Sequence, residues 1–246
     1  MLMSALVFLL VSAQAPCPPD SQQRVSAASA LAQEFDLSGA ADALSTGAAR
    51  GCGDEEIAAL YLRGLVDARE AFRHGAPPAS LVPVHEAIAA LEQIAKNRPG
   101  PAEIARLVLR AAAAAAQSER AEMALYLDQA MRMEGLQRAA GQPEAPILSA
   151  SEVAGDLWLQ IFDYAEARVA FMRAAEGGAA TLRVMRGLAR SAARLGVAGA
   201  ACAEYRALLD RWGSRLPEPP EIAEARVYLG EPECAAGGST GPAPRE

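Results

Sequence analysis

Apolar side chains recur every three or four positions along most of the chain, with polar residues between them. This spacing is typical of amphipathic helices, and no stretch shows the sustained alternation of β-branched and polar residues that indicates strands. Short turns separate the helical stretches, which favours antiparallel packing of neighbouring helices. The pattern therefore predicts an all-α fold.

The expected helices are separated by glycine, proline or polar turns. The helix that begins near residue 54 has Asp54 at its N-cap position and acidic residues in its first turn, which suit the positive end of the helix dipole. The longest internal loop is expected at 135–146, and a tail is expected after Glu231, held near Cys234. The expected helices cover residues 20–35, 38–50, 54–73, 81–97, 101–117, 119–133, 147–161, 163–176, 181–194, 198–212 and 219–229.

The composition of the chain is typical of closely packed helices. Hydrophobic residues make up 52% of the 246 residues but aromatic residues only 5%, because much of the apolar share is alanine, as in AAAAAA at 111–116. Alanine is the best helix former and adds little bulk. The formal net charge of -7 opposes attraction to phosphate backbones and anionic lipid, so nucleic acid is not an expected partner.

A helix pair at 148–181 recurs 34 residues later, at 182–215. Small residues in both copies would let the two helices of a pair approach closely, and large residues would fill the space between pairs. The matched positions are Gly155 with Ala189, Trp158 with Ala192, Tyr164 with Ala198, Ala167 with Ala201, Phe171 with Tyr205 and Ala174 with Leu208.

This pattern resembles the tetratricopeptide repeat, a 34-residue helical hairpin that carries a W-x2-L-G-x2-Y segment followed by A-x3-F. The resemblance is clear over residues 148–215 and degenerate before them. It implies a right-handed α-α superhelix, a solenoid of antiparallel hairpins whose first helices line a concave groove. Because two repeats seldom suffice for a stable fold, we expect the earlier hairpins to stack on the same core, with 219–229 as a capping helix.

Residues 1–15 have the form of a signal peptide, with an uncharged apolar run before small residues. Cleavage is expected after Ala13 or Ala15, and Pro16 favours the first site. The run is too short for a transmembrane helix, which needs roughly 20 apolar residues. We therefore expect an exported protein of the periplasm or extracellular space, with no transmembrane segment in the mature chain.

The expected segments of the whole chain are a signal peptide at 1–15, an N-terminal hairpin at 16–53, degenerate hairpins at 54–134, repeats with a cap at 147–230 and a flexible tail at 231–246.

The four cysteines would lie in an oxidising compartment, and no pair has the CxxC spacing of a metal knuckle or a redox dithiol. Disulfides are therefore expected. Two helices lead away from Cys17 and back to Cys52, so a bond between them would staple the N-terminal hairpin. The lengths of the last two helices bring Cys234 level with Cys202, so a second bond would fasten the capping helix.

The chain lacks the motifs of common catalytic sites, namely a GxSxG elbow, a P-loop and a glycine-rich dinucleotide fingerprint. His74 and His85 flank a proline-bearing loop and could surround a metal with Glu70, but a charge at a helix end is the favoured interpretation of His74. Trp158 is expected in the core, whereas Trp212 could either cover the last hairpin or contribute to a ligand box. We expect no catalytic residue, no metal site and no cofactor.

Four arginines lie at spacings of 3, 4 and 4 on helix 181–194, which places them on one stripe of the helix. In tetratricopeptide-type repeats this face lines the concave groove. Two interpretations stay open: a solvated face whose arginines pair with neighbouring acids, and a groove that binds an acidic segment or a C-terminal carboxylate. In the second case, Arg186→Glu with Arg190→Glu should weaken partner capture and leave melting nearly unchanged. The candidate groove residues are Glu152, Asp156, Gln160, Arg183, Arg186, Arg190 and Arg194.

The expected function is that of an exported, non-catalytic scaffold that binds a protein or peptide partner in the cell envelope. The alternatives are an enzyme with an unrecognised helical active site and a helical protein that binds a small ligand or a glycan. Converging carboxylates or histidines in the deepest cleft would favour catalysis, whereas a broad polar groove would favour partner binding.

Overall fold

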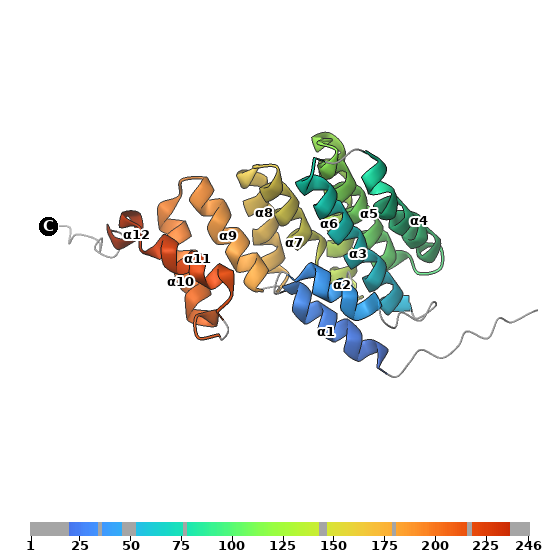
Figure 1. Ribbon diagram of the computed structural model, residues 1–246, viewed down its shortest axis with the longest axis horizontal. Coiled ribbons are helices and arrows are strands. Elements are labelled where there is room, and N and C mark those ends of the chain that lie inside the picture. Colours follow the sequence, from blue (N-terminus) through green and yellow to red (C-terminus); the bar gives the residue numbers. More distant parts are fainter. Residues whose placement is uncertain are drawn as a thin grey trace, which may run out of the picture.

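The computed structural model describes residues 20–33, 36–45, 53–75, 78–142, 147–178, 181–215 and 218–236. Every regular element in these ranges is helical, so the expected all-α fold is confirmed for the described chain (Figure 1). The elements are α1 (Ser21–Gln33), α2 (Leu37–Ser45), α3 (Gly53–Arg73), the 3-10 turn η1 (Pro78–Leu81), α4 (Val82–Ala95), α5 (Pro99–Ala116), α6 (Arg120–Ala139), α7 (Ala150–Gln160), α8 (Tyr164–Glu176), α9 (Leu182–Arg194), α10 (Ala198–Trp212), α11 (Pro220–Leu229) and α12 (Pro232–Ala236).

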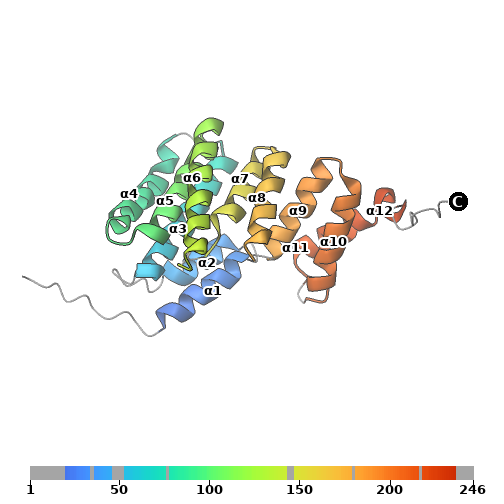
Figure 2. The same ribbon diagram turned by 180° about the vertical axis from the view of Figure 1, so that it is seen from behind.

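The helices from α3 to α12 stand side by side in an elongated row, which Figures 1 and 2 show from opposite sides. Helices α3, α5, α7 and α9 contact one another in that order, so they form one layer along the row. The hairpin of α1 and α2 packs against α3 at the lower edge of this layer. Within the described ranges, no helix combines the length and the apolar character that a bilayer crossing requires.

The same three-residue turn joins the helices of three hairpins in the part of the chain that the structure describes. The middle residue of each turn has a positive φ, of 62° at Ser118, 64° at Phe162 and 73° at Gly196. In each turn the third residue donates its backbone N–H to the carbonyl five residues earlier, at 2.9 to 3.0 Å. Phe162 and Gly196 lie 34 positions apart, so the recurrence found in the sequence has a counterpart in backbone geometry. The turns are 117–119 between α5 and α6, 161–163 between α7 and α8, and 195–197 between α9 and α10.

Phe171 of α8 fills the space between α7 and α9. Its side chain is fully buried, and it lies against the two helical glycines Gly155 and Gly187. A Cβ atom added to Gly155 would lie 2.6 Å from Cε1 of Phe171, and one added to Gly187 would also overlap the ring. The two glycines therefore create the slot that admits the ring and that brings neighbouring hairpins together.

Gly155→Ala should lower the free energy of unfolding by about 1–3 kcal/mol, because the new methyl group overlaps a ring held on both sides in a packed core. The loss outweighs the helix propensity that alanine adds. Gly199→Ala is the matched control, since Gly199 lies in α10 with no atom within 4 Å of an added Cβ. Chemical denaturation should place the control at or above the wild type, and a Gly155→Ala protein as stable as the control would contradict the packing described.

Several helix boundaries differ from the expected ones, and three of the differences change the interpretation of the sequence. Helix α6 continues to Ala139, so the loop expected from residue 135 begins later. Helix α3 begins at Gly53, so Asp54 is its second residue and not the N-cap, and its carboxylate accepts a hydrogen bond from Arg98 at 2.9 Å. The segment after Glu231 is not all tail, because 232–236 form the short helix α12.

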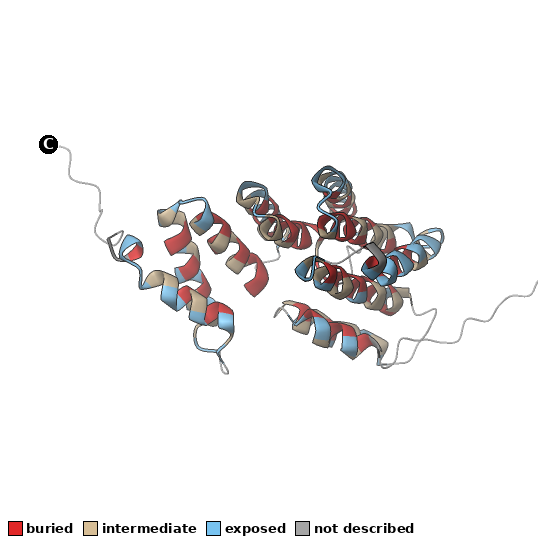
Figure 3. Cartoon of the chain, turned by 45° about the horizontal axis from the view of Figure 1, so that its top comes forward, coloured by how far each residue is buried: buried red, intermediate tan, exposed pale blue. Residues whose placement is uncertain are grey.

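The buried faces of neighbouring helices point toward one another along the row (Figure 3). Most buried residues from α1 to α9 belong to one continuous apolar core. A second, smaller cluster joins α9, α10 and α11 around Tyr205, Leu208 and Ile222. The C-terminal end therefore has little apolar packing of its own and depends on other contacts for its position.

The expected bond between Cys202 and Cys234 is confirmed, and it joins α10 to α12 with a Cα–Cα distance of 5.5 Å. Arg206 of α10 also donates to the carbonyl oxygen of Cys234 at 3.0 Å. Together these contacts hold the chain end that follows α11 against α10. The expected bond between Cys17 and Cys52 and the expected signal peptide at 1–15 lie outside the described residues.

Candidate binding cleft

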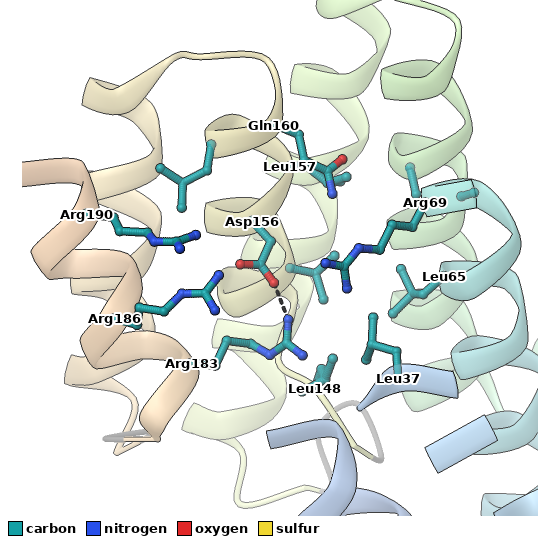
Figure 4. A pocket seen from close by; sticks show the side chains of 14 residues that line it. Leu37, Leu65, Arg69, Leu148, Asp156, Leu157, Gln160, Arg183, Arg186 and Arg190 are labelled. Carbon is teal, nitrogen blue, oxygen red and sulfur yellow. Dashed lines mark hydrogen bonds and ion pairs between the residues drawn. The ribbon is translucent and has the colours of Figure 1, made fainter. Parts of the chain in front are cut away.

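A cleft with a cavity volume of about 230 Å³ opens on the layer formed by α3, α5, α7 and α9. Helix α3 supplies one wall, α9 supplies the opposite wall, and α7 runs between them (Figure 4). Leu37 of α2 closes the lower end next to Leu148, which precedes α7. The lining combines apolar side chains of α2, α3, α5 and α7 with charged side chains that face one another across the cleft.

Arg183 ties the lower end of the cleft together and is only 2% exposed. Its guanidinium donates to the carboxylate of Asp156 on α7 and to the carbonyl oxygen of Ala32 in α1, the latter at 2.7 Å. One side chain thus links α9 to α7 and to the N-terminal hairpin. Arg183 pairs with a neighbouring acid, as the first interpretation expected, but it does not lie on a solvated face, because α1 and α7 cover it.

Arg186 and Arg190 also line the cleft, but each is bonded to a carboxylate of α11. Arg186 donates to Glu221 at 2.8 Å, and Arg190 makes two hydrogen bonds to Glu224. The hydroxyl of Tyr205 donates to the same carboxylate of Glu224 at 2.8 Å. These contacts attach α11 to α9, so Arg186 and Arg190 pair with acids of the same chain, as the first interpretation expected.

The pKa values of these groups follow from burial and from the hydrogen bonds. Burial raises the pKa of Glu224, but the hydrogen bonds from Arg190 and Tyr205 outweigh burial and hold that pKa below its ordinary value. Burial lowers the pKa of Arg186, and the charge of Arg190 lowers it further. Burial and the neighbouring carboxylate raise the pKa of the Tyr205 hydroxyl.

The remaining candidate residues divide between the cleft and its surroundings. Asp156 and Gln160 of α7 line the cleft, whereas Arg194 lies exposed outside its lining. Glu152 is 3% exposed and forms a capping box with Ser149 at the start of α7. Its carboxylate also accepts a hydrogen bond from the hydroxyl of Thr181 at 2.9 Å, and burial raises its pKa. Glu152 therefore positions α7 and the start of α9.

Arg69 of α3 lines the cleft and was not among the expected groove residues. Its half-buried guanidinium reaches across toward Asp156 and Arg183 (Figure 4), and it makes no hydrogen bond or ion pair with any described residue. Burial lowers the pKa of Arg69, and the charge of Arg73 lowers it further. One feature of the sequence could have identified Arg69. It lies four residues after Leu65, on the apolar stripe of α3, where a charged side chain is unusual.

The other residues considered in the sequence lie away from the cleft. His74 contacts Glu70 at 2.8 Å at the exposed end of α3, and His85 lies exposed on α4. Trp158 is buried, as expected for a core residue, and the guanidinium of Arg120 lies 5.4 Å from its ring centroid. Trp212 lines a separate hollow at the end of α10. Among the described residues, no group of three potential ligands could hold a metal ion.

Comparison with protein-family models, with curated proteins and with solved structures finds no match to this chain.

Proposed function

We propose that the chain is an exported helical scaffold of the tetratricopeptide type that binds an acidic segment or a chain end of a protein partner in the cleft between α3 and α9. The observation that carries the proposal is the position of Arg69, a half-buried cation that faces the α9 arginines across the cleft. Its guanidinium makes no hydrogen bond or ion pair with a described residue, and Asp156 and Glu70 attract it only at longer range. A partly buried charge is costly without a counter-charge, so a bound anion would stabilise it.

Two features support the repeat scaffold. The hairpin turns centred on Phe162 and Gly196 have the same geometry at a spacing of 34 residues. Phe171 occupies the space between consecutive hairpins, where the resemblance expects a large residue, and small residues flank it on α7 and α9. In such stacks the layer of first helices provides an extended surface for ligands.

The bond between Cys202 and Cys234 supports export, because structural disulfides persist mainly in oxidising compartments. The lining of the cleft favours binding over catalysis. Among the residues that the structure describes, the lining has one carboxylate, Asp156, which is engaged by Arg183, and it has no histidine, cysteine or serine. The cleft therefore offers charge and apolar surface for recognition, and no nucleophile paired with a base.

Capture of a partner from envelope extract by the immobilised protein tests the proposal. Arg69→Gln should reduce capture at least tenfold while the circular dichroism spectrum stays unchanged, and wild-type capture should fade as salt rises. Arg63→Gln is the matched control, since Arg63 lies on α3 with a 63% exposed side chain and, among the described residues, pairs with Asp67 of the same helix. Equal capture by both variants and the wild type would refute the assignment of the cleft.

A further inference from the structure

The charges of the cleft are largely balanced within the chain. Three of its four arginines already bond to carboxylates of other helices, which leaves Arg69 as the cation in this lining without a bonded partner among the described residues. The existing pairs are Arg183 with Asp156, Arg186 with Glu221 and Arg190 with Glu224. A ligand that carries one negative charge would supply Arg69 with a bonded partner. Each further negative charge on the ligand would have to compete with a carboxylate that is already bonded to an arginine.

The size and lining of the cleft restrict the rest of the ligand. Its volume of about 230 Å³ is smaller than the roughly 300–1,000 Å³ of sites that take drug-sized molecules. Leu37 of α2 closes the lower end, where Arg183 is bonded to the carbonyl oxygen of Ala32. Leu37, Leu65 and Leu148 lie below the guanidinium of Arg69 and line the cleft there, each almost fully buried (Figure 4). A compact apolar group fits this space, and a long polar chain does not.

We infer that the cleft takes a single carboxylate on Arg69 together with a compact apolar group against Leu37 and Leu65. A guanidinium can grip both oxygens of a carboxylate with two parallel hydrogen bonds, which fixes the direction of the attached group. Leu65 lies one helical turn before Arg69, so the cation and the apolar surface face the same ligand. The inference rests on the proposed function, and it selects a chain end or a small free carboxylate over an internal acidic run.

N-acetyl-leucine tests the inference directly, because it carries one carboxylate beside one compact apolar side chain. Its binding, measured by calorimetry and by the shift in melting temperature, should occur with the wild type and with the control Arg63→Gln. Arg69→Gln should weaken it at least tenfold, and Arg69→Lys should weaken it less, because lysine keeps the charge but not the paired hydrogen bonds. N-acetyl-leucinamide, which lacks the carboxylate, should not bind. Equal binding of the acid and the amide, or binding that survives Arg69→Gln, would overturn the inference.

Two more probes identify the source of the carboxylate. Hexanoate carries the same two groups without a peptide backbone, and a tetrapeptide ending in leucine carries them at a chain end. Tighter binding of the tetrapeptide supports a protein C-terminus as the ligand, and equal binding of hexanoate supports a small free carboxylate.

An amidated acidic peptide separates this inference from the proposed function. If that peptide binds through Arg69 and N-acetyl-leucine does not, the cleft is a partner site but the ligand assigned to it is wrong. If no probe binds, the inference fails whatever the capture experiment gives.

Discussion

Cys234→Ser should lower the free energy of unfolding of the C-terminal helices by roughly 3–4 kcal/mol in the chain-entropy model, because the bond closes a loop of 32 residues. The loss should be large because the second apolar cluster, around Tyr205 and Ile222, is small. Helices α11 and α12 should then open before the rest of the chain, and proteases should cleave there first.

Thermal unfolding and limited proteolysis check this expectation. The matched control is Glu233→Ser, which changes the exposed neighbour of Cys234 in α12 and keeps the bond. The control should melt like the wild type. If Cys234→Ser shows the melting temperature and the C-terminal protease resistance of the control, the bond does not hold the end of the chain in place.

Arg186→Glu combined with Arg190→Glu should destabilise the protein by about 2–4 kcal/mol, since it replaces two ion pairs by two like-charge contacts. The expected loss of stability is smaller than for two fully buried ion pairs, because the side chain of Arg190 is 41% exposed. This result would differ from the sequence-based expectation of nearly unchanged melting. That expectation did not include the carboxylates of Glu221 and Glu224 on α11, which the structure brings to these two arginines.

Two further proteins make the test specific. Arg194→Glu changes an exposed arginine of the same helix outside the cleft and should leave melting nearly unchanged. Adding Glu221→Arg and Glu224→Arg to the double variant should restore part of the lost stability by reversing both pairs. If the double variant melts like Arg194→Glu, α11 does not depend on these contacts.

The sequence predicted most helices well, because their apolar residues repeat with the period of one buried face. Helix α6 was predicted too short for a physical reason. Its last turns bury polar side chains, and Glu134, 1% exposed, accepts hydrogen bonds from the backbone of Ala150 and the hydroxyl of Ser151 at the start of α7. A buried polar residue that caps the next helix interrupts the apolar pattern of its own helix. In the sequence, such an interruption resembles the beginning of a loop.

The bond between Cys202 and Cys234 was predictable, because the lengths of two consecutive helices determine where the chain returns. The cleft was only partly predictable. Periodicity placed the α9 arginines on one face but could not show that α1 covers Arg183 or that α11 presents its carboxylates to that face. Arg69 was missed because its relation to α9 depends on the packing of helices far apart in the sequence.

Site-specific photo-crosslinking tests the central claim, that the partner binds in the cleft between α3 and α9. A photoreactive residue at Gln160, which lines the cleft on α7, should form a discrete adduct with the captured partner, and the adduct should fade with rising salt. The same residue at Gln93, which is exposed on α4 outside the lining of the cleft, should form none. An adduct from Gln93 with none from Gln160, or equal adducts from both, would contradict the account.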